Sequence, residues 1–229
     1  MNSICEKQLT DFFERKYELS LEKSILEKTF CSHKQDVLAQ VEILNNIEIK
    51  DYIEYIQTYC KCQPIMASDV FQFSNFDDAT INICRSVCKA GNCGVKFIEV
   101  ANLLFTDNIL RKDGALRKYG ENHIKTAEAM GLAFRNDFKT YYLSAWGCVF
   151  EELSDDAKKK ILLRLIIRNK LITQLFLAAN QGEFDLEAFL YDLSKSTYLR
   201  RRTNINQILE WLNASQEYDF SNLIRNIKH

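Results

Sequence analysis

The sequence DGALRKYGENHIKTAEAMGLAFRNDFKTYYL, residues 113–143, decides the expected fold. Its first part predicts a helix that begins near Asp113 and ends before Gly131, because a glycine suits the left-handed position after a helix. The segments 132–135 and 138–143 are rich in aromatic residues and flank a polar turn. This pattern is typical of a β-hairpin. A long helix followed directly by a hairpin is therefore expected.

Two shorter helices are expected ahead of this pair. Asn75 is a favourable N-cap for a helix over about 76–89, and a second apolar face predicts a helix over about 96–104. Three helices followed by a hairpin is the order of a winged helix. In that module the third helix enters the major groove of DNA and the hairpin contacts the phosphate backbone.

The third helix and its flanks are rich in basic and amide side chains. These are Arg111, Lys112, Arg117, Lys118, Asn122, His123 and Lys125. Lys118, Asn122 and Lys125 share one helical face by their spacing. Asparagine pairs with adenine and lysine with guanine, so this face is expected to reach base edges. Arg135 and Lys139 flank the hairpin tip and are expected to contact phosphate.

The stretch KSTYLRRR, residues 195–202, predicts a second basic helix. Ser196 is the expected N-cap, and an apolar stripe beginning at Leu199 is expected to be buried. Lys195, Arg200, Arg201 and Arg202 are then candidate phosphate contacts, because guanidinium groups near a helix N-terminus suit anions. The alternative is a solvated face whose arginines pair with nearby acids such as Asp192 and Glu210.

Composition predicts a mainly α fold, since the 229 residues include one proline and seven glycines. The expected architecture is two tandem helix-turn-helix units, the first a winged helix with a small β-hairpin, after an N-terminal helical segment. The expected domains are an acidic helical segment over 1–63, a winged-helix domain over 70–153 and a second helix-turn-helix-like domain over 154–229.

Charge is divided unevenly along the chain. Residues 1–80 hold 8 basic and 14 acidic residues, and residues 81–229 hold 22 and 17. Such asymmetry is typical of a protein in which one part meets a polyanion. Double-stranded DNA is thus the expected partner, and the acidic helices are expected to serve a homodimer or a protein partner. Without a signal peptide or a long apolar run, the sequence favours a cytoplasmic protein with no membrane partner.

Three phrases resemble a winged-helix module that recurs in restriction-modification and related prokaryotic defence proteins. They are YYLSAWG at 141–147, STYLRRR at 196–202 and ILEWL at 208–212. The resemblance covers roughly residues 95–213 and implies DNA binding in a defence setting. It does not extend to residues 1–75.

The cysteines raise the question of a structural zinc ion. Zinc takes four soft or imidazole ligands, usually from paired cysteines. The candidate ligands are Cys60, Cys62, Cys84, Cys88 and Cys93. However, no Cys-x2-Cys pair is present and Cys84 falls on an apolar face, which favours buried free thiols and no cofactor.

Two other functions remain open from the sequence. A restriction-type endonuclease, or a subunit of one, needs an aspartate and an acidic-x-Lys triplet on adjacent strands to hold Mg²⁺. Asp36 and the triplet at 48–50 match in letters, but they lie in helical patterns. The other alternative is a protein-interaction adaptor built on winged helices. Because no catalytic constellation is evident, the leading hypothesis is a non-enzymatic DNA-binding protein.

Overall fold

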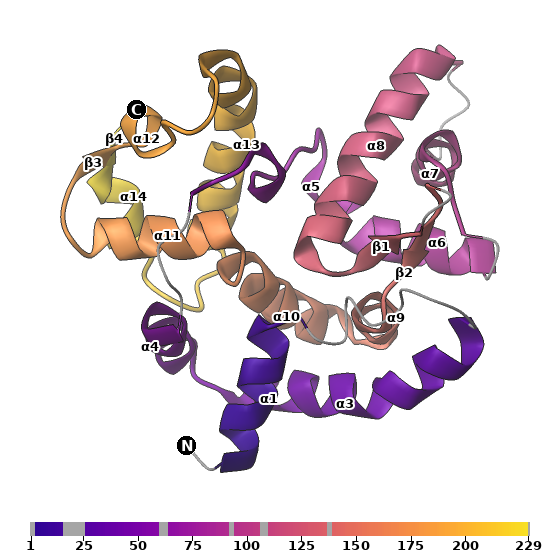
Figure 1. The fold of residues 1–229 in the computed structure, drawn as a ribbon, viewed down its shortest axis with the longest axis horizontal. Helices are drawn as coiled ribbons and strands as arrows, with labels where there is room; N and C mark the ends of the chain where they lie inside the picture. Colours follow the sequence, from indigo (N-terminus) through magenta and orange to yellow (C-terminus); the bar gives the residue numbers. More distant parts are fainter. Residues whose placement is uncertain are drawn as a thin grey trace. The chain divides into compact units, whose positions relative to one another are not determined.

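The fold is mainly helical, as predicted (Figure 1). The computed structural model describes residues 3–15, 26–59, 64–91, 94–105, 110–136 and 139–228. Within these ranges there are 13 α-helices, one 3-10 helix and two sheets of two strands each. The helices are α1 (Ser3–Phe13), α3 (Leu26–Asn46), α4 (Ile49–Tyr59), η1 (Ala67–Asp69), α5 (Phe76–Ala79), α6 (Ile81–Ala90), α7 (Phe97–Leu104), α8 (Asp113–Met130), α9 (Ala145–Glu152), α10 (Asp155–Ile167), α11 (Lys170–Ala179), α12 (Leu186–Phe189), α13 (Lys195–Ala214) and α14 (Ser221–Asn226). The strands are β1 (Ala133–Arg135), β2 (Tyr141–Leu143), β3 (Phe184–Asp185) and β4 (Ile227–Lys228).

The chain forms two compact units, each built from two stretches of sequence. The first comprises Met1–Asn46 and Gln72–Leu162, and the second comprises Ile47–Phe71 and Leu163–His229. The first N-terminal helices belong with the expected winged-helix segment, whereas α4 belongs with the C-terminal helices.

In the first unit, α7 and α8 pack with their backbones almost in contact. A Cβ atom placed on Gly120 of α8 would lie 1.8 Å from the carbonyl oxygen of Phe97 and 3.1 Å from the nitrogen of Ala101. Only a glycine permits this approach, because any side chain would overlap the main chain of α7. Gly120 therefore sets how closely the two helices lie.

The predicted hairpin follows α8. Gly131 ends the helix in the left-handed conformation (φ +84°), as predicted, and β1 then pairs antiparallel with β2. A further antiparallel bridge joins Tyr141 of β2 to Val95, just ahead of α7, through two hydrogen bonds of 2.8 Å. Ser144 donates to the carbonyl of Gly131 over 2.5 Å. The hairpin is therefore hydrogen-bonded to the residue before α7 and, through Ser144, to the residue that ends α8.

The helix expected over 76–89 is in fact two helices. Asn75 caps α5 as predicted, its side chain accepting from two backbone N–H groups. The prediction of a continuous helix was wrong at Thr80, where the backbone leaves the helical region (φ −127°, ψ −83°). The Thr80 hydroxyl donates to the carbonyl of Phe76, which gives this carbonyl a partner other than the helical N–H.

The N-terminal helices of the first unit contribute to its core. Phe12 of α1 packs on Trp146 of α9, with 5.2 Å between ring centroids. The indole N–H of Trp146 donates to Gln40 of α3 over 2.9 Å, and both side chains are buried. The apolar faces of α1 and α3 are thus covered within the chain itself.

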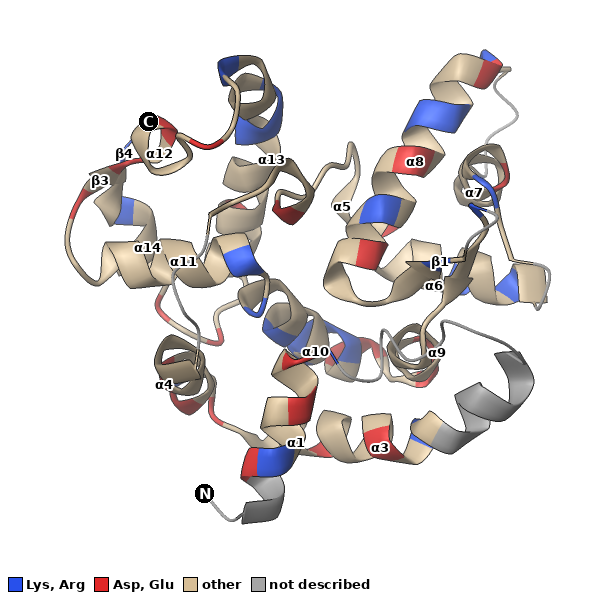
Figure 2. Ribbon diagram, viewed as in Figure 1, with Lys and Arg blue, Asp and Glu red and all other residues tan. Residues whose placement is uncertain are grey.

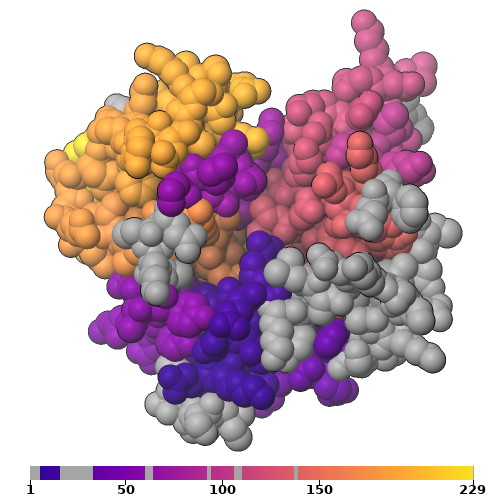
Figure 3. Space-filling view, viewed as in Figure 1, coloured from indigo at the N-terminus to yellow at the C-terminus, as the bar shows by residue number. Residues whose placement is uncertain are grey.

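The second unit is organised around α4, the last residues of α10 (from Leu163), α11 and α14. Arg164 is buried, donating to Glu217 (2.6 Å) and to the carbonyl of Ile47 (3.2 Å), while the Tyr52 hydroxyl donates to the Arg164 carbonyl (2.7 Å). Lys170 pairs with Asp69 at 3.4 Å. Figure 3 shows purple residues of 47–71 beside orange residues of the C-terminal helices on the surface of this unit.

Replacing Gly120 with alanine should destabilise the first unit. The added methyl group would overlap backbone atoms that cannot move without separating α7 from α8, so we expect the free energy of unfolding to fall by about 1–3 kcal/mol. Urea unfolding measures this change. Gly114→Ala in the same helix is the control, because nothing lies within 4 Å of its Cβ position. A native-like Gly120→Ala protein would contradict the packing described.

Candidate nucleic-acid interface

The basic helix α13 begins two residues earlier than predicted. Its N-cap is Ser194, whose hydroxyl accepts from the backbone N–H of Thr197 over 3.3 Å, so the prediction of Ser196 as the cap was wrong. Ser196 instead lies in the first turn. The buried stripe also differs at its start, where Tyr198 is buried while Leu199, expected inside, is 52% exposed.

Arg200 is held along the surface of α13. Its Nε donates to the carbonyl of Ser196 (3.1 Å) and its terminal nitrogen to the hydroxyl of Thr197 (3.3 Å). That hydroxyl also accepts from Ser194 over 2.9 Å. The guanidinium is thereby oriented by neutral groups, and its positive charge is not neutralised by these contacts.

Arg201 and Arg202 lie beside it. Arg202 is exposed and Arg201 is half-buried. Burial, together with the charge of Arg200, lowers the pKa of Arg201. In the part of the chain that the structure describes, no carboxylate forms an ion pair with any of the three arginines, Asp192 and Glu210 included. Lys195, by contrast, lies 3.9 Å from Glu187. The expected alternative of an acid-paired arginine face is therefore not what α13 presents.

Figure 2 shows the two basic helices to differ in charge pattern. The blue bands of α13 lie together at one end, whereas blue and red bands alternate along α8. Tyr191, ahead of α13, adds a side chain that is 78% exposed. A cluster of arginines at one end of a helix makes a positive surface, and such a surface attracts anions.

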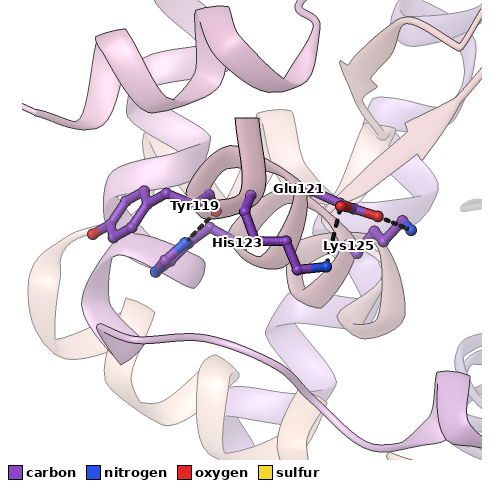
Figure 4. Close-up of polar contacts among 5 residues, drawn as sticks. Tyr119, Glu121, His123 and Lys125 are labelled. Carbon is purple, nitrogen blue, oxygen red and sulfur yellow. Dashed lines mark hydrogen bonds and ion pairs between the residues drawn. The ribbon is translucent and has the colours of Figure 1, made fainter. Parts of the chain in front are cut away.

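The predicted face of α8 lies on the surface, but its lysines are paired. Glu121 accepts from Lys118 over 3.3 Å and from Lys125 over 2.6 Å (Figure 4). The two lysines are 59% and 49% exposed and Glu121 only 25%. Hydrogen bonds from Lys125 and Lys118 lower the pKa of Glu121, so it is a carboxylate. Asn122 is half-buried on the same face.

His123, which the sequence placed among the basic and amide residues of this segment, is not part of this surface. It is fully buried, with Nδ1 2.7 Å from the carbonyl oxygen of Tyr119 and Nε2 accepting from the backbone N–H of Asn75. The Tyr119 ring stacks on the imidazole at 3.9 Å, and its hydroxyl donates to Asp78. Burial lowers the pKa of His123, so the ring is neutral and joins α8 to the start of α5.

The remaining predicted cations of the first unit lie in α8 or in the segments just before and after it. Arg111 lies 3.7 Å over the ring of Phe105, a cation–π contact. Lys112 and Arg117 are exposed, as are Arg135 and Lys139 on either side of the hairpin tip. Residues 137 and 138 of the tip lie outside the described residues. Lys139 has a left-handed backbone (φ +58°), and Asn136 holds the loop by accepting from the N–H of Thr140.

Of the five candidate zinc ligands, only Cys84 and Cys88 lie among the described residues. No group of three or more His, Cys, Asp or Glu side chains within the described ranges is placed to hold a metal ion. Cys60, Cys62 and Cys93 lie outside those ranges. Cys84 is buried, and burial raises the pKa of its thiol, while Cys88 is exposed. Cys84 is thus a protonated core residue.

The residues that match a nuclease motif lie in two helices and in the connection between them. Asp36 lies within α3 and Lys50 in the first turn of α4, and Glu48 lies in the short connection between these two helices. The described residues around them include no strand. The adjacent strands on which such a metal site depends are therefore not formed by these residues.

Comparisons with known protein families, curated proteins and solved structures find no match to this chain. No helix among the described residues has the length and apolar character needed to cross a membrane. A functional assignment therefore rests on the residues of this chain.

Stability should depend on pH through His123. Because its folded pKa lies below the ordinary value of 6.5, its contribution to the free energy of unfolding is present above pH 6.5 and is lost as the pH falls below it. We expect urea unfolding to show lower stability at about pH 5 than at pH 7.5, and the difference to shrink in His123→Gln. An unchanged difference in this variant would assign the effect to other groups.

Proposed function

We propose that this protein binds double-stranded DNA without catalysing a reaction on it. The observation that carries the proposal is the arginine cluster of α13, formed by Arg200, Arg201 and Arg202. Three adjacent guanidinium groups, one of them half-buried, have no carboxylate partner among the described residues. Like charges held together at a surface are unfavourable unless an anion binds there, and closely spaced phosphates provide such an anion.

The element order of the first unit supports a winged helix. Helix α6 is followed by Val95, which bridges to β2, then by α7, α8 and the β1–β2 hairpin. A winged helix has this order, with the third helix in the major groove and the hairpin as the wing. In this proposal α8 is the recognition helix, and Arg135 and Lys139 of the wing contact phosphates.

The second unit repeats part of this plan. Helix α11 is followed by β3, α12 and the longer α13, in helix-turn-helix order. Helix α13 is then the second DNA-contacting helix. Its cations anchor the backbone, with Lys195 adding a further phosphate contact. Arg111, Lys112 and Arg117 have the same role around α8.

Sequence discrimination is assigned to α8. Lys118, Asn122 and Lys125 share one face and carry the donors and acceptors that base edges in the major groove recognise. Phosphate contacts give affinity for any duplex, whereas base contacts distinguish one sequence from another. The resemblance to defence proteins extends the proposal to a prokaryotic restriction-modification or related setting, in the cytoplasm, with dimer or partner contacts made by the acidic N-terminal helices.

A specific observation favours one other candidate, a protein-interaction adaptor. The acidic and basic residues of α8 balance, and Ile98 and Leu103 of α7 are exposed at 36% and 39%. Balanced charge and exposed apolar side chains suit a protein partner better than a polyanion. The adaptor predicts no duplex binding even at low salt.

The decisive experiment measures the affinity for a random duplex pool across a salt series. The variant Arg200→Ala/Arg201→Ala/Arg202→Ala should bind more weakly to all sequences, and its salt slope should fall by about 1 for each phosphate contact removed. Lys50→Ala/Arg225→Ala/Lys228→Ala removes the same charge from exposed positions of the same unit and is the control. Equal losses in both variants would indicate a general charge effect and contradict the proposed anchor.

Asn122→Ala tests the groove assignment of α8. We expect this variant to lose about 1–3 kcal/mol of discrimination between a selected duplex and single-base-pair changes in it, because a bidentate base contact is removed. Its affinity for the random pool should change little. Competition binding with labelled duplexes measures both quantities. Equal weakening for every duplex would place α8 outside the major groove.

A further inference from the structure

The carboxylate of Glu121 lies at the centre of the face proposed to meet base edges. It is on the same side of α8 as Lys118 and Lys125, three residues before and four residues after. Both ammonium groups bond to it, one to each carboxylate oxygen (Figure 4). The face is therefore an alternating row of donor, acceptor and donor.

A carboxylate is a poor group to present to DNA in general. It repels the phosphate backbone and halves the net charge that the two lysines would otherwise bring. No such acid accompanies the arginines of α13 among the described residues. A carboxylate on a DNA-facing surface thus reduces binding to most sequences and favours those with a donor opposite it.

The donor that suits it in the major groove is the exocyclic amine of cytosine. Glutamate accepts from N4 of cytosine, while lysine donates to O6 and N7 of guanine. The two bases of one G·C pair present these groups side by side. A lysine and a glutamate that are bonded to each other on one helical face therefore offer a donor to guanine and an acceptor to cytosine.

Resting on the proposed DNA-binding function, we propose that Glu121, with Lys118 or Lys125, reads a G·C base pair in the major groove. The ion pairs of the free protein hold the three side chains together on one face of α8. On binding, an ammonium donates to guanine and the carboxylate accepts from cytosine. Glu121 then determines specificity and lowers affinity for duplexes without this pair.

The test begins with selection of preferred duplexes from a random pool by the native protein. The affinity of the native protein, Glu121→Gln and Glu54→Gln is then measured for a selected duplex and for copies with each G·C pair replaced by A·T. Glu54 is the matched control, because it pairs with Lys50 at 3.8 Å across one helical turn of α4 and carries the same charge. Urea unfolding confirms that both variants remain folded.

We expect one G·C→A·T change to weaken native binding by about fivefold or more, the scale of one good base contact. Glu121→Gln should bind the random pool more tightly and lose this discrimination, because glutamine pairs with adenine. Glu54→Gln should behave as native. If Glu121→Gln retains the native preference, or if no G·C pair is required, the inference is overturned while duplex binding stands. If the native protein binds no duplex at low salt, the proposed function fails as well.

Discussion

The first unit depends on the backbone contact between α7 and α8 at Gly120. Since no side chain fits between this residue and the carbonyl of Phe97, the two helices meet along their main chains. That contact sets the direction of α8. Gly131 then turns the chain into the hairpin, and Tyr141 returns it to Val95 ahead of α7. Helix α8 is therefore held by α7 and by the β1–β2 hairpin, and these two elements fix the direction of its outer face.

The buried side of α8 completes this support through polar contacts. His123 binds the backbone at Asn75, and Tyr119 reaches Asp78 of α5. A buried imidazole with both nitrogens bonded is favourable only in its neutral form, which links the position of α8 to proton concentration. The side chains of α8 that face solvent are thus carried by a helix whose opposite side is held through His123 and Tyr119.

The two basic helices divide affinity from discrimination in the proposed mechanism. The α13 arginines lack acidic partners among the described residues and would attract any phosphate backbone. On α8, Glu121 offsets the charge of Lys118 and Lys125. Charge balance of this kind weakens general attraction and leaves recognition to hydrogen-bond geometry at base edges.

Local signals predicted the helix ends and the hairpin well. Asn75 and Gly131 act as expected, because a cap depends on side-chain and backbone atoms within a few residues. The predictions of a continuous helix through Thr80 and of a cap at Ser196 were wrong for related reasons. Either of two nearby serines could cap α13, and a threonine hydroxyl competed with a helical bond. Neighbouring residues alone do not rank such alternatives.

The sequence by itself determined the mainly helical class, the hairpin after α8 and the positions of the cationic residues, since these follow from short-range periodicity and turn chemistry. Only the tertiary structure decided that α4 packs with the C-terminal helices and that His123 faces inward. It also decided that Glu121 pairs with two lysines while the α13 arginines form no ion pair with an acid among the described residues. Burial and ion pairing depend on which surfaces meet and how side chains are oriented there, and no single segment encodes that.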